Sequence, residues 1–392
     1  MRKKIILIYA WLFPSYPLNN GFNINEREKV KALINNNFEI KWIQGMGAKI
    51  SDYPDFFKQH LEIIPTLNLK REFKILEYLH FWFNLFRLTY SSKKKYEPIM
   101  IFVGPDLVLP GLFLKVLFRL PLVSYLCDSW LPYKRKELQK TFLKYYAIIL
   151  LESLAKLADK IILVNDKEAS YLSGNGFDKK KIVVDHLSSV NIKKELIENR
   201  KNIRDQLIKE LKIDSQCKIV FFHGLPNIIS NVLAFNEICN NIAPQVEKID
   251  NRIIFILAGG NLSQIGINDK GKNLISVGYI ENREKIISYL ISADLYVLPI
   301  EIGSGVKTKL LDAMNARIPI LTTKFIQEEF VGEPPFILSK IDEFPTRIVE
   351  SIYDESLLKS IREKTSLYIN NYDNSMHVSL IESINDLIKH WT

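Results

Sequence analysis

Cysteine and histidine are scarce in this sequence of 392 residues, which has three of the former and six of the latter. Cys127, Cys217 and Cys239 lie far apart and match no metal-ligand spacing, and no two histidines have the H-x-x-x-H spacing of a zinc site. These absences exclude a disulfide scaffold and leave no metal site to predict. We interpret the cysteines as reduced packing residues of a cytoplasmic protein.

The sequence also lacks a hydrophobic run long enough to span a membrane, which requires roughly 18 to 20 apolar residues. Its most apolar stretch, Leu107 to Leu126, is interrupted by Lys115 and Arg119. The basic residues 2–4 precede the apolar run Ile5–Phe13 and imitate a secretory signal. No small-residue cleavage site follows, so we favour a buried first strand.

Charge is distributed unevenly along the chain. Residues 1–195 contain 31 basic and 19 acidic residues, a net charge of +12, whereas the remainder has 22 basic and 25 acidic residues, a net charge of −3. Nucleic acid and an anionic membrane surface are both possible partners of a basic half. No nucleic-acid motif accompanies the charge, so we expect a membrane surface and no nucleic acid.

Short apolar strands alternate with helical periods along the whole chain, which predicts doubly wound parallel α/β sheets. Continuous apolar runs are typical of parallel strands that are buried on both faces. Helices are expected at Asn25–Asn35, Asn231–Asn241, Arg283–Ser292 and Val306–Asn315. Strands are expected at Ile5–Ala10, Phe38–Ile43, Ile99–Val103, Leu122–Leu126, Lys160–Val164, Ile182–Val184, Lys218–Phe222, Ile253–Ala258, Leu274–Val277, Leu295–Pro299 and Ile318–Thr322.

The charge-rich segment Asn191–Asp214 resembles an exposed helix and separates two α/β units. We therefore expect an N-terminal domain over 1–195, a second domain over 196–375, and a C-terminal helix over 376–392 that crosses back to the first domain. Ligands of such folds bind at the carboxyl ends of the strands, and we expect them in a cleft between the two domains.

One glycine turn carries the chemistry. A strand ends near Pro299, Gly303 and Gly305 follow, and a helix opens near Val306. The glycines permit a close backbone approach, and the N–H groups of a new helix attract an anion. Lys307 and Lys309 in the first turn are locally unfavourable by roughly 0.3 to 1 kcal/mol each, so together they indicate an anionic partner such as a diphosphate.

Helical spacing places Gly305, Lys309 and Asp312 on one face of this helix. The carboxylate of Asp312 would then lie along the same groove as the phosphate site, where it can accept hydrogen bonds from ribose hydroxyls. The alternative is a surface helix with an ordinary Lys309–Asp312 pair, worth a few tenths of a kcal/mol.

The whole string resembles the carboxyl-terminal signature of retaining glycosyltransferases with the GT-B fold, the family-4 type (glycosyl transferases group 1), in a Gly-Ser-Gly variant. The residues that carry the resemblance are Pro299, Gly303-Ser304-Gly305, Leu311-Asp312-Ala313-Met314 and the sequence Ile-Pro-Ile-Leu-Thr-Thr at 318–323, with Phe222-His223-Gly224, residues 255–260, residues 277–280 and Leu157–Val164 upstream. The resemblance implies two Rossmann-like domains facing each other across a cleft. It also implies a UDP- or GDP-sugar as donor substrate, no other cofactor and no metal.

The resemblance further implies a donor site. Asp312 stands where the second glutamate of an E-x7-E pattern usually binds the ribose, and Ser304 stands at the first glutamate position. The family places Arg and Lys after the first strand of this domain, whereas His223–Asn231 contains neither. The implied donor-binding residues are Gly21, Gly224, Gly278, Ile280, Glu301, Gly303, Ser304, Gly305, Val306, Lys307, Lys309 and Asp312.

Two further residues are candidates for catalysis. Asp128 follows a predicted strand and either lines the acceptor side or caps the next turn. His223 ends a strand of the second domain and either contacts ligand or packs. His186, beside the expected joint, is interpreted as a structural loop residue.

The stretches Tyr78–Tyr90 and Leu107–Leu120 mix apolar residues with scattered Lys and Arg, and Lys93–Lys95 and Lys134–Lys136 lie nearby. Core helices with solvated faces explain this mixture, but it also suits an interfacial helix on an anionic leaflet. We expect peripheral association with the cytoplasmic membrane face.

The sequence therefore predicts transfer of a sugar, with retention of configuration, to a hydroxyl of a lipid-linked or surface glycan acceptor. Stabilising the departing diphosphate with N–H groups and lysines requires no metal. An inactive GT-B-like scaffold subunit is the alternative, since Ser304 and the lack of a histidine between His80 and His186 depart from the family pattern. An epimerase on the same architecture fits the Gly-Ser-Gly string less well.

Overall fold

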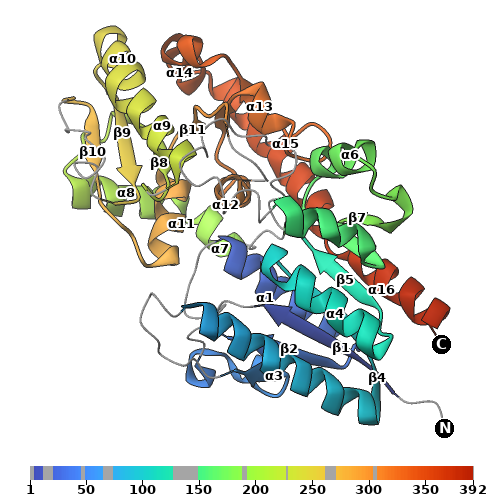
Figure 1. The fold of residues 1–392 in the computed structure, drawn as a ribbon. Coiled ribbons are helices and arrows are strands. Elements are labelled where there is room, and N and C mark those ends of the chain that lie inside the picture. Colours follow the sequence, from blue (N-terminus) through green and yellow to red (C-terminus); the bar gives the residue numbers. More distant parts are fainter. Residues whose placement is uncertain are drawn as a thin grey trace. The chain divides into compact units, whose positions relative to one another are not determined.

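The chain divides into two compact units in a computed structural model that describes residues 4–11, 21–45, 49–64, 74–126, 149–187, 192–226, 228–260, 271–302 and 307–391. The N-terminal unit comprises Met1–Ser188 together with Met376–Thr392, and the C-terminal unit comprises Ser189–Ser375. Figure 1 shows the helices and strands of both units.

The N-terminal unit is built on a parallel sheet. Within the described residues it has seven strands in the order β3-β2-β1-β4-β5-β6-β7. The central strand β1 pairs with β2 and β4, and its residues Ile6 to Ala10 are buried because helices cover both faces. The strands are β1 (Lys4–Trp11), β2 (Ile40–Gln44), β3 (Leu61–Ile63), β4 (Tyr96–Val103), β5 (Leu122–Tyr125), β6 (Lys160–Leu163) and β7 (Ile182–Val184).

Helices cover this sheet on both sides, and one of them comes from the far end of the sequence. The last helix, α16, packs against β7 (Figure 1). Its buried residues Leu380, Ile384 and Leu387 recur at helical spacing, which gives it one apolar face. The helices are α1 (Gly21–Asn35), α2 (Asp55–Lys58), α3 (Lys74–Lys95), α4 (Val108–Phe118), α6 (Asp166–Gly174) and α16 (Val378–Trp391).

The C-terminal unit repeats this plan with a second parallel sheet. Its described strands follow the order β10-β9-β8-β11-β12-β13. Strand β8 lies in the middle, so the direction of winding reverses between β8 and β11. The strands are β8 (Lys218–His223), β9 (Ile253–Ala258), β10 (Leu274–Ser276), β11 (Leu295–Leu298), β12 (Ile320–Thr322) and β13 (Ile337–Leu338).

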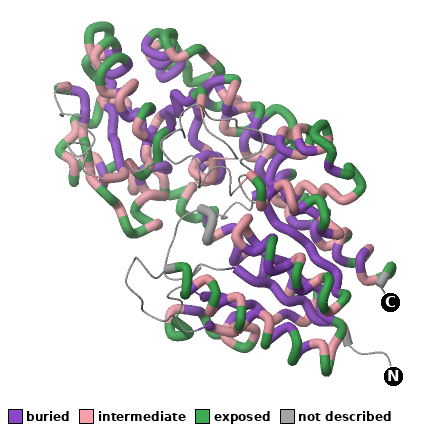
Figure 2. Tube along the Cα trace, in the orientation of Figure 1, coloured by how far each residue is buried: buried purple, intermediate pink, exposed green. Residues whose placement is uncertain are grey.

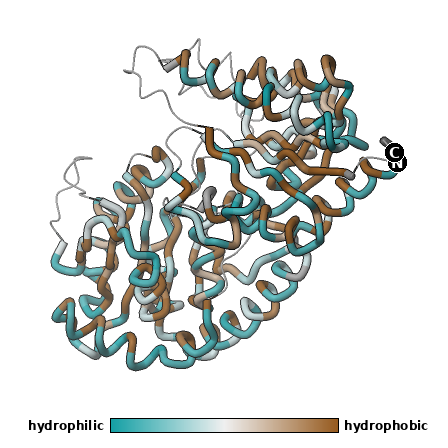
Figure 3. The backbone as a smooth tube through the Cα atoms, turned by 90° about the horizontal axis from the view of Figure 1, so that it is seen from below, coloured by the Kyte–Doolittle hydropathy of each residue, from teal (hydrophilic) through white to brown (hydrophobic). Residues whose placement is uncertain are grey.

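The helices of this unit flank the sheet, and the hydrophobic core lies between the sheet and these helices. Burial is concentrated in the strands (Figure 2), and the strands also carry the most hydrophobic stretches (Figure 3). The helices are α7 (Lys194–Glu198), α8 (Arg200–Leu211), α9 (Ile229–Glu237), α10 (Ala243–Ile249), α11 (Arg283–Ser292), α12 (Thr308–Asn315), α13 (Lys324–Gln327), α14 (Phe344–Ile352) and α15 (Glu355–Asn374).

The predicted GT-B architecture of two doubly wound parallel sheets is confirmed. The outer strands β3 and β13 were not predicted, because β13 has only two residues and Glu62 interrupts the apolar residues of β3. The charged segment before β8 forms two helices rather than one exposed helix. Its Arg204 donates to the carbonyls of Ser292 and Cys217, at 2.5 and 2.8 Å, and pairs with Asp294 at 3.0 Å, so part of α8 fastens the end of α11.

Candidate functional site

The candidate site lies at the carboxyl ends of β8 and β11, where the winding of the C-terminal sheet reverses. Ligands of open α/β sheets bind at such a switch point. Helix α9 follows β8, and α12 follows β11 after residues 299–307. Side chains from β8, β11, α9, α11 and α12 meet there in a group that we call the carboxyl-edge network: His223, Asn231, Arg283, Tyr296, Lys309 and Asp312.

Lys309 joins three elements of this network. Its Nζ donates to the backbone carbonyl oxygen of His223 at 3.0 Å and to Oδ1 of Asn231 at 2.6 Å, and it lies 4.5 Å from the ring centroid of Phe222. An ammonium group has three N–H donors. Two are used in these hydrogen bonds to described residues.

Burial, together with the positive charge of Lys307, lowers the pKa of Lys309 to about 7. An anion bound at this edge would restore the charged form. Lys307 is the residue that precedes α12, and its side chain is half-buried. The two lysines predicted to meet a diphosphate therefore act on each other electrostatically.

Asp312 is held by an arginine that the sequence did not identify. Nη2 of Arg283, the first residue of α11, donates to Oδ1 of Asp312 at 2.5 Å. Burial raises the pKa of this carboxyl, and the Arg283 guanidinium opposes the rise. The two side chains remain 23% and 17% exposed, so the pair faces solvent at one side. No sequence pattern relates Arg283 to Asp312, because they become neighbours only when α11 and α12 pack together.

His223 is the last residue of β8, and its ring is surrounded by aromatic groups. Its Nδ1 lies 3.3 Å from the hydroxyl of Tyr296, and its ring stacks on that of Phe221 at 5.5 Å. Burial, together with the positive charges of Lys309 and Arg283, lowers the pKa of His223 to about 3. The imidazole is therefore neutral at physiological pH and can act as a hydrogen-bond partner.

Two glycines bring the loops after β8 and β9 into contact. A Cβ atom on Gly259 would lie 1.7 Å from the carbonyl oxygen of Gly224, and one on Gly224 would lie 2.6 Å from Cγ of Asn231. Asn231 also donates to the carbonyl of Leu225 at 3.0 Å. The predicted site residue Gly224 is thus packed directly on the residue that holds Lys309.

The remaining predicted donor residues are dispersed. Gly278 follows β10 with a φ of +71° and accepts a hydrogen bond from the Gly259 N–H at 2.8 Å, and Ile280 is half-buried beyond it. Glu301 is exposed after β11, and Gly21 begins α1 in the N-terminal unit. Gly303, Ser304, Gly305, Val306 and Asp128 lie outside the described residues.

The N-terminal unit has a second group of charges, which the sequence analysis did not identify. We call Glu26, Lys29, Asp185 and His377 the buried ion cluster; it lies among Tyr9 of β1, Tyr125 of β5, and α1. Lys29 is only 1% exposed, and its Nζ lies 3.7 Å from Glu26 and 3.6 Å from Asp185. His377 Nδ1 lies 3.1 Å from Asp185.

Opposite charges hold this cluster together. Burial alone would raise the pKa of Asp185, but His377 and Lys29 outweigh it and lower the pKa. Burial raises the pKa of Glu26, against the attraction of Lys29. Because His377 immediately precedes α16, the cluster binds the start of the last helix to the first sheet.

The C-terminal unit is similar in sequence to a known protein family. Residues 217–354 match the family model of glycosyl transferases group 1, which confirms the resemblance inferred from the sequence. The match lies within the C-terminal unit and includes both β8 and α12. The sequence matches no curated protein.

Similar solved structures share the fold over the full chain. HepE from Anabaena in complex with UDP and glucose has a TM-score of 0.65 at 12% identity, covering 100% of this chain and 99% of its own. Sucrose-phosphate synthase from Thermosynechococcus elongatus has a TM-score of 0.68 at 14% identity, with 99% of each chain covered. The UDP-forming α,α-trehalose-phosphate synthase from Burkholderia vietnamiensis has a TM-score of 0.68 at 9% identity, covering 98% and 100%.

The described residues offer neither a membrane span nor a group of metal ligands. No helix there combines the length and the apolar character that crossing a bilayer requires. Over the same ranges, no three His, Cys, Asp or Glu side chains are grouped so as to hold a metal ion.

Proposed function

We propose that the protein is a glycosyltransferase that moves a sugar from a UDP- or GDP-sugar to a hydroxyl of a lipid-linked or surface glycan, with retention of configuration. The observation that carries the proposal is the carboxyl-edge network, which gathers positive charge at the switch point of a domain that matches the glycosyltransferase family. UDP is the first nucleotide to test, because UDP is the nucleotide bound to HepE.

Each group in the network has a role in this proposal. The third N–H of Lys309, the charge of Lys307 and the Gly303–Gly305 turn receive the diphosphate. Asp312 presents Oδ2 to the ribose hydroxyls, while Arg283 holds Oδ1. Glu301 completes the donor site, and Gly278 and Ile280 lie toward the base. Positive charge placed in advance stabilises the departing nucleoside diphosphate, which is the main physical demand of the reaction.

Three further residues complete the proposal. Gly21 contributes to the donor side, and Asp128 and His223 are retained as candidates for the reacting end. His223, being neutral, would donate or accept a hydrogen bond rather than hold a charge. No metal or further cofactor is invoked.

We also propose that helices α3 and α4 rest on an anionic membrane. Exposed apolar residues recur at helical spacing on both helices, among them Phe83, 66% exposed, and Val116, 77% exposed. These helices contact each other, and Phe86 and Phe118 pack between them at 5.3 Å. Lys94 and Lys95 are exposed at the end of α3, and each such charge contributes about 1 kcal/mol near an anionic surface.

Co-sedimentation tests this membrane contact. Wild type should sediment with vesicles containing anionic phospholipid, and the Phe83→Ser, Val116→Ser variant should remain in the supernatant. The matched control is the Leu367→Ser variant, because Leu367 is an exposed apolar residue of α15. Equal sedimentation of all three proteins would contradict the assignment.

Release of nucleoside diphosphate tests the reaction itself. The purified protein is incubated with UDP-, GDP- or ADP-sugars together with a lipid and glycan extract. We expect release from one class of donor, dependent on the extract, and at least a tenfold loss in Lys309→Met. A folded wild type that binds the donor without turnover would instead support the inactive scaffold, which the family match does not favour.

A further inference from the structure

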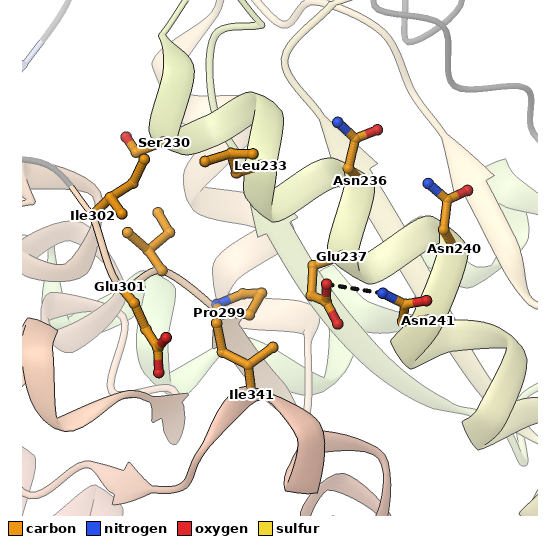
Figure 4. Close-up of a pocket in the computed structure, with 11 residues that line it drawn as sticks. Ser230, Leu233, Asn236, Glu237, Asn240, Asn241, Pro299, Glu301, Ile302 and Ile341 are labelled. Carbon is orange, nitrogen blue, oxygen red and sulfur yellow. Dashed lines mark hydrogen bonds between the residues drawn. The ribbon is translucent and has the colours of Figure 1, made fainter. Parts of the chain in front are cut away.

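A cavity of about 270 Å³ lies beside the carboxyl-edge network, on the flank of α9. One wall is formed by α9 and the turn that follows it, and the other by residues 299–302 and Ile341 (Figure 4). Pockets that enclose drug-sized ligands have volumes of roughly 300 to 1,000 Å³. This cavity is therefore large enough for a single sugar ring and too small for a whole nucleotide.

The α9 wall is polar and carries no positive charge. It presents the amides of Asn236, Asn240 and Asn241 and the carboxylate of Glu237. Asn241 donates to Oε2 of Glu237 at 2.9 Å, which fixes the orientation of the carboxylate (Figure 4). None of the described residues that line the cavity is basic, so the cavity is unsuited to a phosphate.

The facing wall is mainly apolar. Pro299, Ile302 and Ile341 line it, Leu233 of α9 adds a further apolar side chain, and Glu301 contributes one carboxylate. Amide groups both donate and accept hydrogen bonds, and carboxylates accept them. A ligand that matches both walls has hydroxyl groups along one side and C–H groups on the other, which describes a neutral pyranose ring.

An unusual helical turn forms the polar wall. Between α9 and α10, residues Ile238–Ile242 form a π-helical turn, in which the Ala243 N–H donates to the Ile238 carbonyl five residues earlier. Pro244 accounts for its position, because proline has no N–H and its ring clashes with the carbonyl of Asn240. Such turns are rare and recur at functional sites. Here the turn carries two of the three amides.

We propose that this cavity binds one neutral sugar ring, separately from the diphosphate site. This inference rests on the proposed function in one respect, the molecule that supplies the sugar ring. That molecule is either the nucleotide-sugar donor or the glycan acceptor. The residues that would bind the ring are Asn236, Glu237 and Asn240, and none of them belongs to the carboxyl-edge network.

Saturation-transfer NMR on the full chain tests the proposal, with glucose, galactose, mannose and N-acetylglucosamine as probes and glucuronic acid as the anionic control. Wild type should give signals for at least one neutral sugar and none for glucuronic acid. The saturation-transfer signal should be at least fivefold weaker in the Asn236→Leu, Asn240→Leu variant. Asn251→Leu, an exposed residue outside the cavity, should retain it. No signal from any neutral sugar, or equal signals in both variants, would overturn the proposal.

Two further measurements are needed. The first distinguishes failure of this proposal from failure of the proposed function, and the second identifies the molecule that supplies the sugar ring. UDP should raise the melting temperature of wild type and of the double variant equally; the absence of a shift in both contradicts the proposed function but leaves the sugar result standing. Displacement of the sugar probe by UDP-glucose but not by UDP identifies the donor as the source of the ring. A probe that stays bound in the presence of UDP-glucose identifies the acceptor.

Discussion

Each unit of the molecule has a group of ionisable side chains beside its sheet. The two groups differ in their exposure to solvent and in their balance of charge. The side chains of the buried ion cluster in the N-terminal unit are buried from solvent, and each cation has an acidic partner. The carboxyl-edge network has Lys309 and Arg283 beside one carboxylate, that of Asp312, and it faces solvent at one side. A closed, compensated group stabilises the fold, whereas an open group with excess positive charge is suited to bind an anion.

The largest effect is expected in the closed cluster. Replacing Lys29 with Met removes the cation beside Glu26 and leaves Asp185 with His377 alone, and loss of one partner of a buried pair costs about 3–5 kcal/mol. All five tryptophans belong to the N-terminal unit, so tryptophan fluorescence during urea unfolding reports on this unit. Lys31→Met removes an exposed pair with Glu28 and should cost about 0–1 kcal/mol. Equal losses in the two variants would remove the distinction between the two groups.

The next effect is expected in the open network, on binding rather than on folding. Lys309→Met removes a charged hydrogen bond to the diphosphate, worth about 1.5–3 kcal/mol, which corresponds to roughly 10- to 150-fold weaker binding of UDP. Calorimetric titration measures the change. Lys324→Met, an exposed lysine of α13, is the control and should bind UDP as wild type does. Unchanged affinity in Lys309→Met would place the diphosphate elsewhere.

A change of one glycine should destabilise only the second unit. Gly259 has a φ of +144°, and a Cβ there would collide with the carbonyl of Gly224. Strained backbone alone costs on the order of 1–3 kcal/mol, so Gly259→Ala should lower the melting transition of the C-terminal unit. Circular dichroism should record this loss while the tryptophan transition stays unchanged. Gly176→Ala, where a Cβ meets nothing within 4 Å, is the comparison for a clash-free glycine with positive φ.

The smallest predicted effect is a dependence on pH. The pKa of Lys309 is about 7 in the folded protein and about 10.4 in an unfolded chain. The unfolded chain therefore binds the extra proton between these values, and this residue's contribution to stability rises with pH across that window. The affinity for an anionic ligand changes in the opposite direction. It falls as pH rises, because deprotonation removes the charge of Lys309.

UDP-glucose is the ligand for this test because its diphosphate diester keeps the same charge across the range. Its affinity for wild type should fall about tenfold from pH 6 to pH 8, following the protonated fraction. Lys309→Arg retains a charge and should give a flat profile over the same range. A flat profile in wild type would show that Lys309 stays protonated at this edge.

Local patterns in the sequence predicted the strands and helices well, because apolar runs and helical spacing are properties of short segments. The strand at Lys160–Leu163 and the helix at Arg283–Ser292 lie where they were expected. The helix after the glycine turn is described from Thr308, with Lys307 as its cap. Lys309 and Asp312 were identified from spacing alone, but the partners of both were not.

Those partners depend on tertiary packing. Asn231 and the His223 carbonyl reach Lys309 only because α9 and α12 follow neighbouring strands, and Arg283 reaches Asp312 only across α11 and α12. The buried ion cluster has the same origin, since Lys29 and His377 are brought together from opposite ends of the chain. A single sequence contains no local signal for such pairs.

The most direct test of the central claim is thermal shift of the full chain with UDP, GDP, ADP and their sugars, beside the Lys309→Ala, Asp312→Ala variant. A nucleotide at 100 times its dissociation constant should stabilise wild type by about 2.7 kcal/mol. We predict a shift with one nucleotide class in wild type and none in the folded variant. The same shift in both proteins would contradict the claim that the open network of the C-terminal unit is the donor site.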